Sequence, residues 1–392
     1  MKNISKRNFL KSIGGLGVYL AGVNLPVWAI NSTANAATSS LSRKLLKADK
    51  NGVMLMEGFT SRIVAKAGKS VKGYKWHNHA DGGATFKTED EGWIYVSNSE
   101  ANNGGVGAIR FDKNANIVDG YQICKNTRRN CAGGLTPWNT WLTCEEYAEG
   151  YTWECDPFGK KKQIKIKSLG MFNHEAAAVD PKTSTIYQTE DAGSSGFFRF
   201  IPDQKITEIG QLQDVKGKFQ VMKINSGSKV QWNDVPNPLA EMKNVKDKEL
   251  MRRKENKDVE YTKFKRGEGA WYNEGKVYFA TTATNEIWVF DIKNNTCKTL
   301  YKGRGALTRP DNITVSNNGL VMAAEDGGNM EICGISKKGK AFPILRVSKH
   351  KKSELTGPAF NPLGNRLYFS SQNGKGKGSI TFEVTGPFNK LS

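Results

Sequence analysis

One kind of strand recurs along this chain at nearly even intervals. Each copy alternates bulky and small residues, follows a turn rich in Gly, Asn, Asp or Pro, and ends in polar residues. The copies are separated by about 46 residues, with one double step of about 90, and propeller blades repeat every 40–50 residues. The copies cover residues 93–98, 141–146, 186–191, 277–281, 320–326 and 367–371. This period predicts an all-β fold, a six-bladed β-propeller, rather than a β-sandwich with irregularly spaced strands.

A second element precedes four of these strands by about ten residues, as expected for neighbouring strands of one blade. It covers residues 175–179, 268–271, 311–315 and 357–360. The inner strand of every propeller blade lines one central channel, so the residues that open these strands should converge there. The stretch 206–263 is rich in lysine, contains Pro236 and Pro238, and is expected to be inserted loops or irregular blade material within the double step.

The chain carries a formal charge of +20. Such a charge favours anionic partners, which include nucleic acids, acidic surfaces and small phosphate esters. The lysines are scattered over connecting segments, and no basic helix or basic stripe interleaved with aromatic residues occurs. We therefore expect most of the lysines to lie on a solvated surface, and we expect no nucleic-acid partner.

The N-terminus has the features of an export signal. A Ser-Lys-Arg-Asn-Phe-Leu-Lys run at residues 5–11 precedes an apolar stretch and a small-residue cleavage pattern, Ala34-Asn35-Ala36. The run resembles a twin-arginine signal in which Lys6 replaces the first arginine, so both the Tat and the Sec route remain open. We expect a signal peptide over 1–36, a single propeller domain over 37–392, no permanent membrane anchor, and a periplasmic or secreted mature protein.

Acidic residues recur at the ends of the predicted blade strands, as in Glu145-Glu146, Glu175, Glu190-Asp191, Glu268, Asp311 and Glu325-Asp326. Carboxylates gathered on one axis would repel one another unless cations bind between them. Oxygen-rich sites suit calcium, manganese or ferric iron, and a thiolate nearby would add affinity for iron or zinc. The sequence therefore predicts a metal site in the central channel.

The six cysteines do not match the spacing of a zinc finger or zinc ribbon. In an exported chain each could form a disulfide or remain a buried thiol. The four histidines are too scattered for a His-Glu-x-x-His site, and no Gly-x-Ser-x-Gly elbow or Walker loop occurs. These absences favour hydrolysis by a metal-bound oxygen nucleophile, which needs no nucleophilic side chain.

Several motifs resemble those of the PhoX-type alkaline phosphatases, which are exported bacterial enzymes that contain iron and calcium. The longest is NCAGGLTPWNTWLTCEE at residues 130–146, within which Leu135 and Asn139 vary the pattern. Shorter motifs lie at residues 172–176, 189–191, 266–270, 309–312 and 325–327. Their order and spacing match from about Phe59 to Pro387, although this chain is shorter than the best-known members.

The resemblance implies a six-bladed propeller with two ferric ions and calcium ions joined by an oxo group. It assigns Cys131 as the thiolate that bridges the irons. It implies that Arg266 clamps the phosphoryl oxygens through paired hydrogen bonds and that Asn98 contacts the phosphate. The carboxylate ligands that it implies are Glu146, Glu175, Glu268 and Glu325, together with Glu190, Asp191 and Asp311.

The expected function is hydrolysis of phosphate monoesters by an exported, metal-dependent phosphatase. One alternative is a phosphodiesterase or phosphotriesterase that uses the same metals. Another is a propeller without catalytic activity that binds metal for stability and a partner on its face. Arg266, two residues from Glu268, argues against the last alternative, because a purely structural metal site needs no phosphate clamp.

Overall fold

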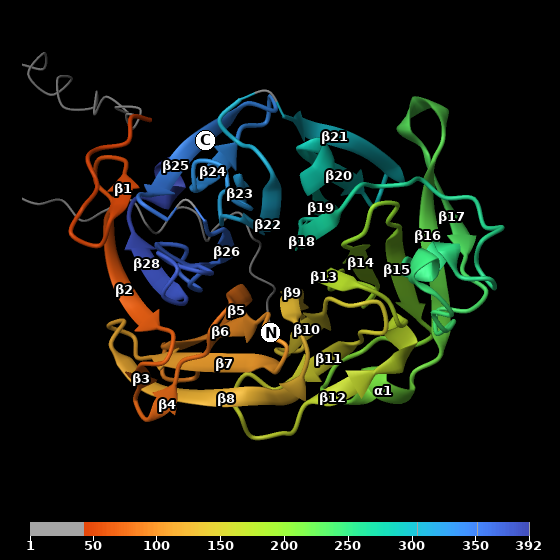
Figure 1. Cartoon of the computed structure of the whole chain (residues 1–392), viewed down its shortest axis with the longest axis horizontal. Coiled ribbons are helices and arrows are strands. Elements are labelled where there is room, and N and C mark those ends of the chain that lie inside the picture. Colours follow the sequence, from red (N-terminus) through yellow and green to blue (C-terminus); the bar gives the residue numbers. More distant parts are fainter. Residues whose placement is uncertain (1–42, 304, 351, 392) are drawn as a thin grey trace, which may run out of the picture. The chain divides into compact units, whose positions relative to one another are not determined.

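The computed structural model describes residues 43–303, 305–350 and 352–391, so the predicted export signal at 1–36 lies outside the described residues. Its strands form six sheets arranged around a central axis like the blades of a propeller (Figure 1). The only α-helix among the described residues is the single turn α1 (Gln211–Asp214). No helix among the described residues is long and apolar enough to cross a membrane.

In each blade the strands follow one another from the axis outwards, and every neighbouring pair is antiparallel. Blade 1 consists of β5 (Ala80–Lys87), β6 (Trp93–Ser99), β7 (Gly104–Phe111) and β8 (Ile117–Thr127). Blade 2 consists of β9 (Asn130–Leu135), β10 (Trp141–Glu145), β11 (Thr152–Cys155) and β12 (Ile164–Ile166). Blade 3 has five strands, β13 (His174–Val179), β14 (Ile186–Glu190), β15 (Phe197–Pro202), β16 (Gly217–Ile224) and β17 (Val230–Asp234).

The second half of the ring repeats the same plan. Blade 4 consists of β18 (Gly267–Asn273), β19 (Lys276–Thr281), β20 (Glu286–Asp291) and β21 (Thr296–Lys302). Blade 5 contains β22 (Pro310–Val315), β23 (Val321–Glu325), β24 (Glu331–Ile335) and β25 (Ala341–Val347). Blade 6 contains β26 (Leu355–Phe360), β27 (Arg366–Ser371) and β28 (Ile380–Thr385).

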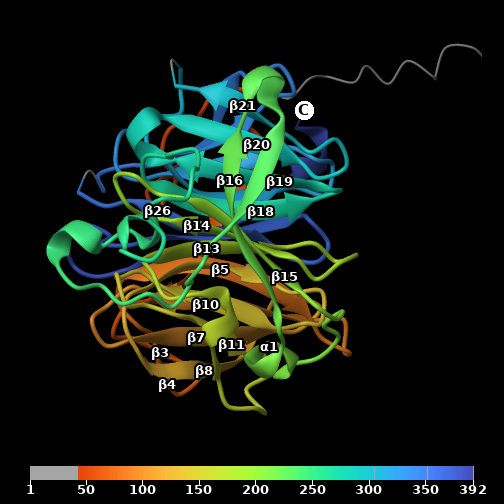
Figure 2. The same cartoon turned by 90° about the vertical axis from the view of Figure 1, so that its right-hand side faces the viewer.

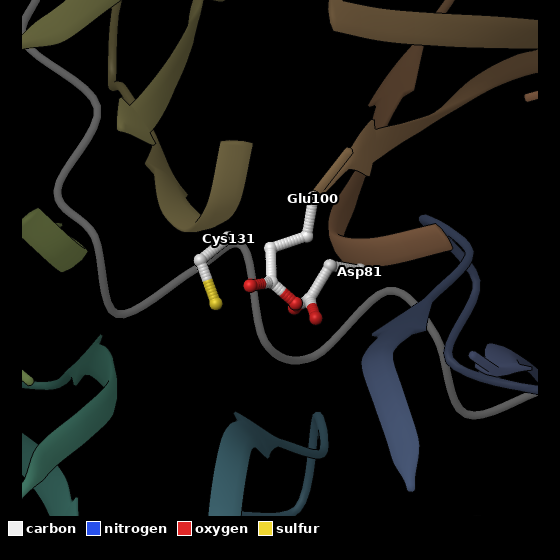
Figure 3. Close-up of side chains that lie close together, drawn as sticks. All are labelled: Asp81, Glu100 and Cys131. Atoms are coloured by element: carbon white, nitrogen blue, oxygen red, sulfur yellow. The ribbon is translucent and has the colours of Figure 1, made fainter. Parts of the chain in front are cut away.

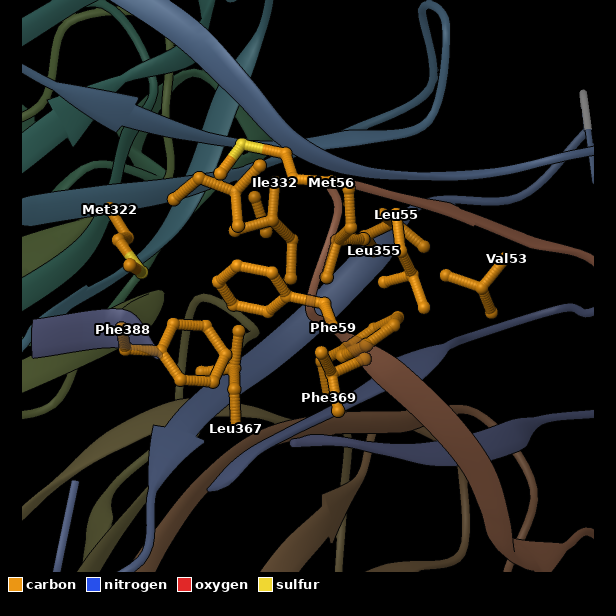
Figure 4. Close-up of a cluster of buried hydrophobic side chains, with 14 of the residues drawn as sticks. Val53, Leu55, Met56, Phe59, Met322, Ile332, Leu355, Leu367, Phe369 and Phe388 are labelled. Atoms are coloured by element: carbon orange, nitrogen blue, oxygen red, sulfur yellow. The ribbon is translucent and has the colours of Figure 1, made fainter. Parts of the chain in front are cut away.

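Two strands from the start of the described chain complete the last two blades. β1 (Val53–Leu55) pairs with β25, and β2 (Thr60–Lys66) pairs with β28. Apolar side chains from these strands and their connection, including Met56 and Phe59, pack with Leu367 and Phe369 in a buried cluster (Figure 4). Burial of this apolar surface ties the beginning of the chain to its end and closes the ring.

The remaining short elements lie between or outside the blades. A small hairpin, β3 (Ser70–Val71) with β4 (Tyr74–Lys75), follows β2. Figure 2, a view from the side, shows blade 3 nearest the viewer, with β16 running along its outer part. The 3₁₀ helices are η3 (Lys167–Leu169), η4 (Ser226–Ser228), η5 (Val245–Asp247), η6 (Leu250–Arg252), η7 (Thr282–Thr284) and η8 (Phe388–Lys390).

The six-bladed propeller predicted from the sequence is confirmed. Each of the six recurring aromatic strands is the second strand of its blade, and the four predicted strands ahead of them are inner strands. The double step arises because blade 3 has a fifth strand and a long connection follows it. α1, β16, β17 and the turns up to residue 266 occupy this interval.

All six inner strands carry a β-bulge at nearly the same place. In blade 1, Asp81 and Gly82 together face the single residue Asn98, and the other five blades have the same two-to-one arrangement. A bulge bends its strand and redirects a side chain, and bulges are common beside active sites. The repeated bulge explains how the same position of the inner strand is turned toward the axis in all six blades.

The second residue of each bulge lines a narrow cavity of about 20 Å³ on the axis, roughly the space of one water molecule. Glycine is needed at two of these positions, because a Cβ on Gly82 would lie 2.5 Å from the Cα of Ala132, and one on Gly269 would lie 2.7 Å from the Cα of Asn312. The channel is therefore nearly filled at the level of the second bulge residues.

Candidate metal centre

The first residue of each bulge in blades 1 to 5 is a carboxylate or a thiol. These residues, which we call the inner ring, are Asp81, Cys131, Glu175, Glu268 and Asp311. All are buried, and Glu175 has no exposed surface. In blade 6 the corresponding bulge residue is Gly357, in the left-handed region with φ 58°. The ring thus presents five possible metal ligands from five blades.

A second set of side chains follows the end of each second strand. In every blade the backbone N–H of this residue donates to the carbonyl of the residue two or three positions before the bulge, over 2.8–3.2 Å. This set, the outer ring, consists of Glu100, Glu146, Asp191, Thr282, Asp326 and Gln372. The shared hydrogen bond holds each outer-ring residue beside the start of its blade's inner strand.

Three groups of potential ligand atoms occur in the two rings, each with its atoms within 4.8 Å of one another. They are Asp81 with Glu100 and Cys131, Cys131 with Glu146 and Glu175, and Glu175 with Glu268 and Asp311. Figure 3 shows the first group, in which the two carboxylates and the thiol point toward one another. Because consecutive groups share Cys131 or Glu175, they form one continuous site that could hold several ions.

Glu175 provides the test of whether this site suits a cation. Both of its carboxylate oxygens are buried and have no hydrogen-bond partner among the described residues. Buried polar atoms in native proteins are almost always paired, and an unpaired buried carboxylate is especially costly. Hard carboxylate oxygens with one thiolate match the donors that iron and calcium take in proteins. The residues therefore fit a cluster of such ions.

The electrostatics of the rings lead to the same conclusion. Burial, reinforced by Glu268, Asp311 and other neighbouring carboxylates, raises the pKa of Glu175 well above its ordinary value. Burial followed by the charge of Asp81 likewise raises the pKa of the Cys131 thiol. Burial, with Glu100 next in importance, raises the pKa of Glu146 to about 9. Without bound cations the site would hold protons, which metal ions can replace.

Two amide side chains support the ligands without belonging to the metal groups. Asn98 donates to the carbonyls of Cys131 and Ala132, at 2.8 Å each, and accepts from the indole N–H of Trp141. Gln372 donates to both Asp81 and Glu100 at 2.9 Å. Asn98 therefore lies against the Cys131 bulge, with its amide engaged by the protein, and Gln372 joins two carboxylates of the first group.

Glu190 and Glu325 lie one residue before the outer ring, and their carboxylates are bound to loop backbone. Glu190 accepts from the N–H groups of Leu250 and Gly196, at 2.8 and 3.1 Å. Glu325 accepts from those of Thr308 and Glu331, at 2.8 and 3.0 Å. Neither belongs to the metal groups formed by the described residues. Of the carboxylates predicted as ligands, the structure brings together Glu146, Glu175, Glu268 and Asp311.

The residues just before the inner strands form a collar at the mouth of the site. The collar consists of His79, Arg129, Asn173, Arg266, Arg309 and Glu354, whose carbonyls accept the hydrogen bonds from the outer ring. Its arginine side chains are 39–52% exposed, whereas the inner ring is buried. A layer that contains three cations therefore borders the carboxylates on the solvent side.

Arg266 binds three carboxylates from this position. Its Nε and Nη2 donate to the two oxygens of Asp191 at 2.9 and 3.0 Å, and Nη2 also lies 3.1 Å from Glu268. Its Nη1 lies 3.6 Å from Asp326. The hydrogen bonds that the guanidinium donates to Asp191 are the largest cause that raises the pKa of Arg266, so the guanidinium stays charged. Asp191 thus lies in the outer ring as the partner of Arg266.

Sequence reasoning missed Asp81 and Glu100. Asp81 opens an inner strand as Glu175 and Glu268 do, but the Gly82-Gly83 pair after it is typical of a turn. Glu100 follows its strand as Glu146 does, which was the available signal. All six cysteines are free and buried, so the structure has the buried thiols that the sequence left open as an alternative to disulfides.

Comparison with known families gives a match that covers most of the chain. The model of the family described as alkaline phosphatase PhoX matches residues 57–152, 147–298 and 290–374. These segments include every residue of the inner and outer rings. A search of curated proteins gives no match.

A solved PhoX structure shows the same fold. PhoX of Pseudomonas fluorescens, in complex with vanadate as a transition-state analogue, is similar with a TM-score of 0.73 and 16% identity, covering 88% of this chain and 98% of that one. A Bacteroides thetaiotaomicron protein of unknown function has a TM-score of 0.51 and 8% identity, covering 83% and 76%. A Xanthomonas campestris gluconolactonase has a TM-score of 0.46 and 11% identity, covering 87% and 92%.

Proposed function

The chain belongs to the family of PhoX alkaline phosphatases and is a phosphoric ester hydrolase. From this premise we propose that it hydrolyses phosphate monoesters at the collar and rings with the help of bound metal ions. The observation that carries the proposal is the buried Glu175 carboxylate, which has no hydrogen-bond partner among the described residues. Glu175 belongs both to the ligand group that contains Cys131 and to the one that contains Asp311. A site of this composition is explained by cations and by an anionic substrate that approaches them.

Iron and calcium are the ions that we propose. Cys131, Glu146 and Glu175 would hold the ferric ions, and the remaining carboxylates of the rings would hold calcium. When bound, these ions supply positive charge that polarises the phosphoryl group and lowers the pKa of water. The oxygen-rich groups suit calcium. The single thiolate gives the site a higher affinity for iron than a site made of oxygen ligands alone would have.

Arg266 is proposed to bind the phosphoryl oxygens as negative charge spreads over them during transfer. Its guanidinium lies at the solvent side of the rings, 39% exposed, with Asp191 fixing one edge through two hydrogen bonds. A side chain held in this way is preorganised, so it stabilises developing charge without having to reorganise. Arg266 therefore contributes both charge and orientation.

Asn98 is proposed to act through Cys131 as a positioning residue. Its two donated hydrogen bonds hold the carbonyls of Cys131 and Ala132, and Trp141 fixes the orientation of the amide. Through this contact Asn98 sets the direction of the Cys131 thiol. A direct contact with the phosphate would require the amide to give up one of these partners.

Export to the periplasm is proposed from the signal-like N-terminus, with Ala34-Asn35-Ala36 as the cleavage pattern. Outside the cytoplasm the enzyme would meet phosphate esters that cells cannot take up directly. The test is mass analysis of the mature protein from a periplasmic extract, where a chain that begins near Ala37 is expected. A full-length chain retained in the cytoplasm would contradict export.

The proposed activity is tested with p-nitrophenyl phosphate and bis-p-nitrophenyl phosphate on the purified, metal-loaded protein. We expect the monoester to be hydrolysed with the higher kcat/KM, and Cys131→Ser to lose both activities together with its iron. Preferential hydrolysis of the bis-ester would overturn the monoesterase assignment in favour of a diesterase on the same metal site. Hydrolysis of neither compound would overturn the proposed function.

A further inference from the structure

Three of the six collar residues are arginines, and all three have backbone conformations that non-glycine residues rarely adopt. The φ angles of Arg129, Arg266 and Arg309 are 47°, 56° and 47°, in the left-handed region. Such conformations persist where the surrounding structure enforces them, and they gather at functional sites. Here the shared hydrogen bond from the outer ring fixes the carbonyl of each arginine.

Each arginine folds back over the rings. Arg129 binds Glu100 and Glu146, at 3.0 and 2.7 Å, and Arg309 binds Asp326 at 2.5 Å. The collar therefore holds cations above carboxylates on blades 2, 4 and 5. One phosphoryl clamp would need one of them, and of the other two Arg309 is the one that shares a carboxylate with Arg266.

Arg266 and Arg309 are neighbours, because they lie on adjacent blades and share one carboxylate oxygen. Oδ2 of Asp326 lies 3.6 Å from Nη1 of Arg266 and 2.5 Å from Nη2 of Arg309. Arg266 also pairs with Asp191 and Glu268, so carboxylates already surround its guanidinium, whereas Arg309 has only the shared Asp326 as an ion-pair partner among the described residues. An additional anionic group would therefore be attracted to the Arg309 side of this pair.

Arg309 has more free capacity than Arg266. Its side chain is 52% exposed, compared with 39% for Arg266, and Asp326 is its single ion-pair partner among the described residues. Both nitrogens at one edge of the Arg266 guanidinium are instead bound to Asp191. Arg309 can therefore accept a further anion without losing an existing pair.

We propose that Arg309 binds a second anionic group of the substrate, so that the preferred substrates are phosphate monoesters that also carry a carboxylate or another phosphate a few atoms from the reacting phosphoryl. This inference rests on the proposed function and adds a substrate class to it. Arg266 contacts the phosphoryl beside the rings, while Arg309, farther into solvent, contacts the second group. A planar guanidinium suits either anion because it can donate two parallel hydrogen bonds.

The test compares 3-phosphoglycerate with glycerol 3-phosphate, which has a hydroxymethyl group in place of the carboxylate. The measured quantity is the ratio of their kcat/KM values for the metal-loaded enzyme. We expect the wild type to favour 3-phosphoglycerate by about tenfold or more, the scale of one hydrogen bond to a charged group. Arg309→Ala should bring the ratio close to one, chiefly by raising KM for 3-phosphoglycerate.

Arg309→Lys should recover part of the ratio, since it keeps the charge but loses the planar fork. Arg110→Ala is the matched control, because Arg110, which is 39% exposed, is likewise paired with one carboxylate, Asp90, but lies on blade 1. It should retain the wild-type ratio. Thermal unfolding and metal content of each variant show whether any change in the ratio comes from a damaged fold.

Two results would overturn the inference. In the first, the wild type hydrolyses both compounds with equal kcat/KM, which would exclude recognition of a second anion. In the second, Arg309→Ala lowers both values by the same factor, which would place Arg309 on the reacting phosphoryl. If neither compound nor p-nitrophenyl phosphate is hydrolysed, the proposed function itself fails, and the inference fails with it.

Discussion

The Glu175 side chain gives the strongest support for a metal centre over a merely acidic channel. Its oxygens have no protein partner among the described residues, whereas those of Glu190 accept two backbone N–H groups. The two glutamates are equally buried, with no exposed surface. Burial alone therefore cannot separate their roles, but their hydrogen bonds can.

We predict opposite effects of Glu175→Gln on the loaded and the metal-free protein. Loss of the ligand should remove bound metal and lower hydrolysis by at least about a hundredfold, since even indirect partners of a metal can cost 10–100-fold. The chelated variant should melt at a higher temperature than chelated wild type, because an amide costs less to bury than a carboxylate. Elemental analysis and thermal unfolding measure both effects.

Glu190→Gln is the matched control for Glu175→Gln. It weakens the acceptor of the Gly196 and Leu250 N–H groups, so it should lower the melting temperature with or without chelator. Its metal content should stay at the wild-type level. Loss of metal from this variant, with retention in Glu175→Gln, would exchange the roles assigned to the two residues.

We predict that Arg266→Ala keeps the metals and the fold but lowers turnover on p-nitrophenyl phosphate by on the order of a hundredfold, the scale of losing one oxyanion donor. Arg266→Lys should recover little, because an ammonium group lacks the planar guanidinium that binds both oxygens of Asp191 and presents its other N–H groups to the phosphoryl oxygens. Activity, iron content and calcium content are measured on the same samples. Wild-type turnover in Arg266→Ala would show that the arginine only pairs with carboxylates.

At the level of elements, the repeated bulge was beyond sequence reasoning, although the strands were not. Aromatic alternation identified the second strand of every blade, because that strand packs on both faces between neighbouring blades. The inner strands of blades 1 to 4 are rich in glycine and alanine, residues that also occur in turns. Asp81 was missed for this reason, since its strand begins Ala-Asp-Gly-Gly.

The candidate site was predicted in part, and the sequence could not supply the rest. Motifs at Cys131, Glu146 and Glu175 pointed to candidate ligands that the structure brings together, because each motif carries a recognisable local pattern. Glu190 and Glu325 occupy the same patterns one residue earlier, and their contacts with loop backbone depend on connections far away in sequence. A strand's two faces alternate, so adjacent acidic residues in one strand end must have different roles.

We predict that Gly269→Ala disrupts the bulge of blade 4. The new Cβ would lie 2.7 Å from the Cα of Asn312 on blade 5, so either inner strand must shift. Overpacking of this kind costs about 1–3 kcal/mol in the free energy of unfolding, and the shift should also weaken metal binding by the flanking Glu268. Denaturant unfolding and metal titration measure the two effects.

The control for this substitution is Gly193→Ala. A Cβ on Gly193 would meet only Oε1 of Glu249, at 3.9 Å, which is an ordinary contact. Both its stability and its metal affinity should stay close to the wild-type values. Equal behaviour of the two variants would show that the close approach of blades 4 and 5 is not needed for the site.

For the whole molecule, the closed ring forces many carboxylates onto one axis, and this determines the response to pH. Burial, with Asp326 next, raises the pKa of Asp311 to about 7, and burial raises that of Glu146 to about 9. Unfolded carboxyl groups titrate near pH 4. Between these values the folded, metal-free protein binds more protons than the unfolded chain, so its stability falls as pH rises.

We predict that the melting temperature of chelated protein decreases from pH 5 to pH 9, and that loading with iron and calcium removes most of this decrease. Cations then neutralise the carboxylates that protons neutralise at low pH. Thermal unfolding at several pH values, with and without metals, measures the effect. A melting temperature that rises with pH in the chelated protein would contradict the burial of unpaired carboxylates.

The central claim, that the propeller axis holds a cluster of iron and calcium ions needed for phosphate-ester hydrolysis, is tested most directly by removing and restoring the ions in one preparation. The loaded protein should contain both metals and show an iron–thiolate absorption band that Cys131→Ser lacks. Chelation should abolish the band and the hydrolysis of p-nitrophenyl phosphate, and addition of iron and calcium together should restore both. Full hydrolysis after complete removal of the metals, or stoichiometric zinc with no iron in active protein, would contradict the account.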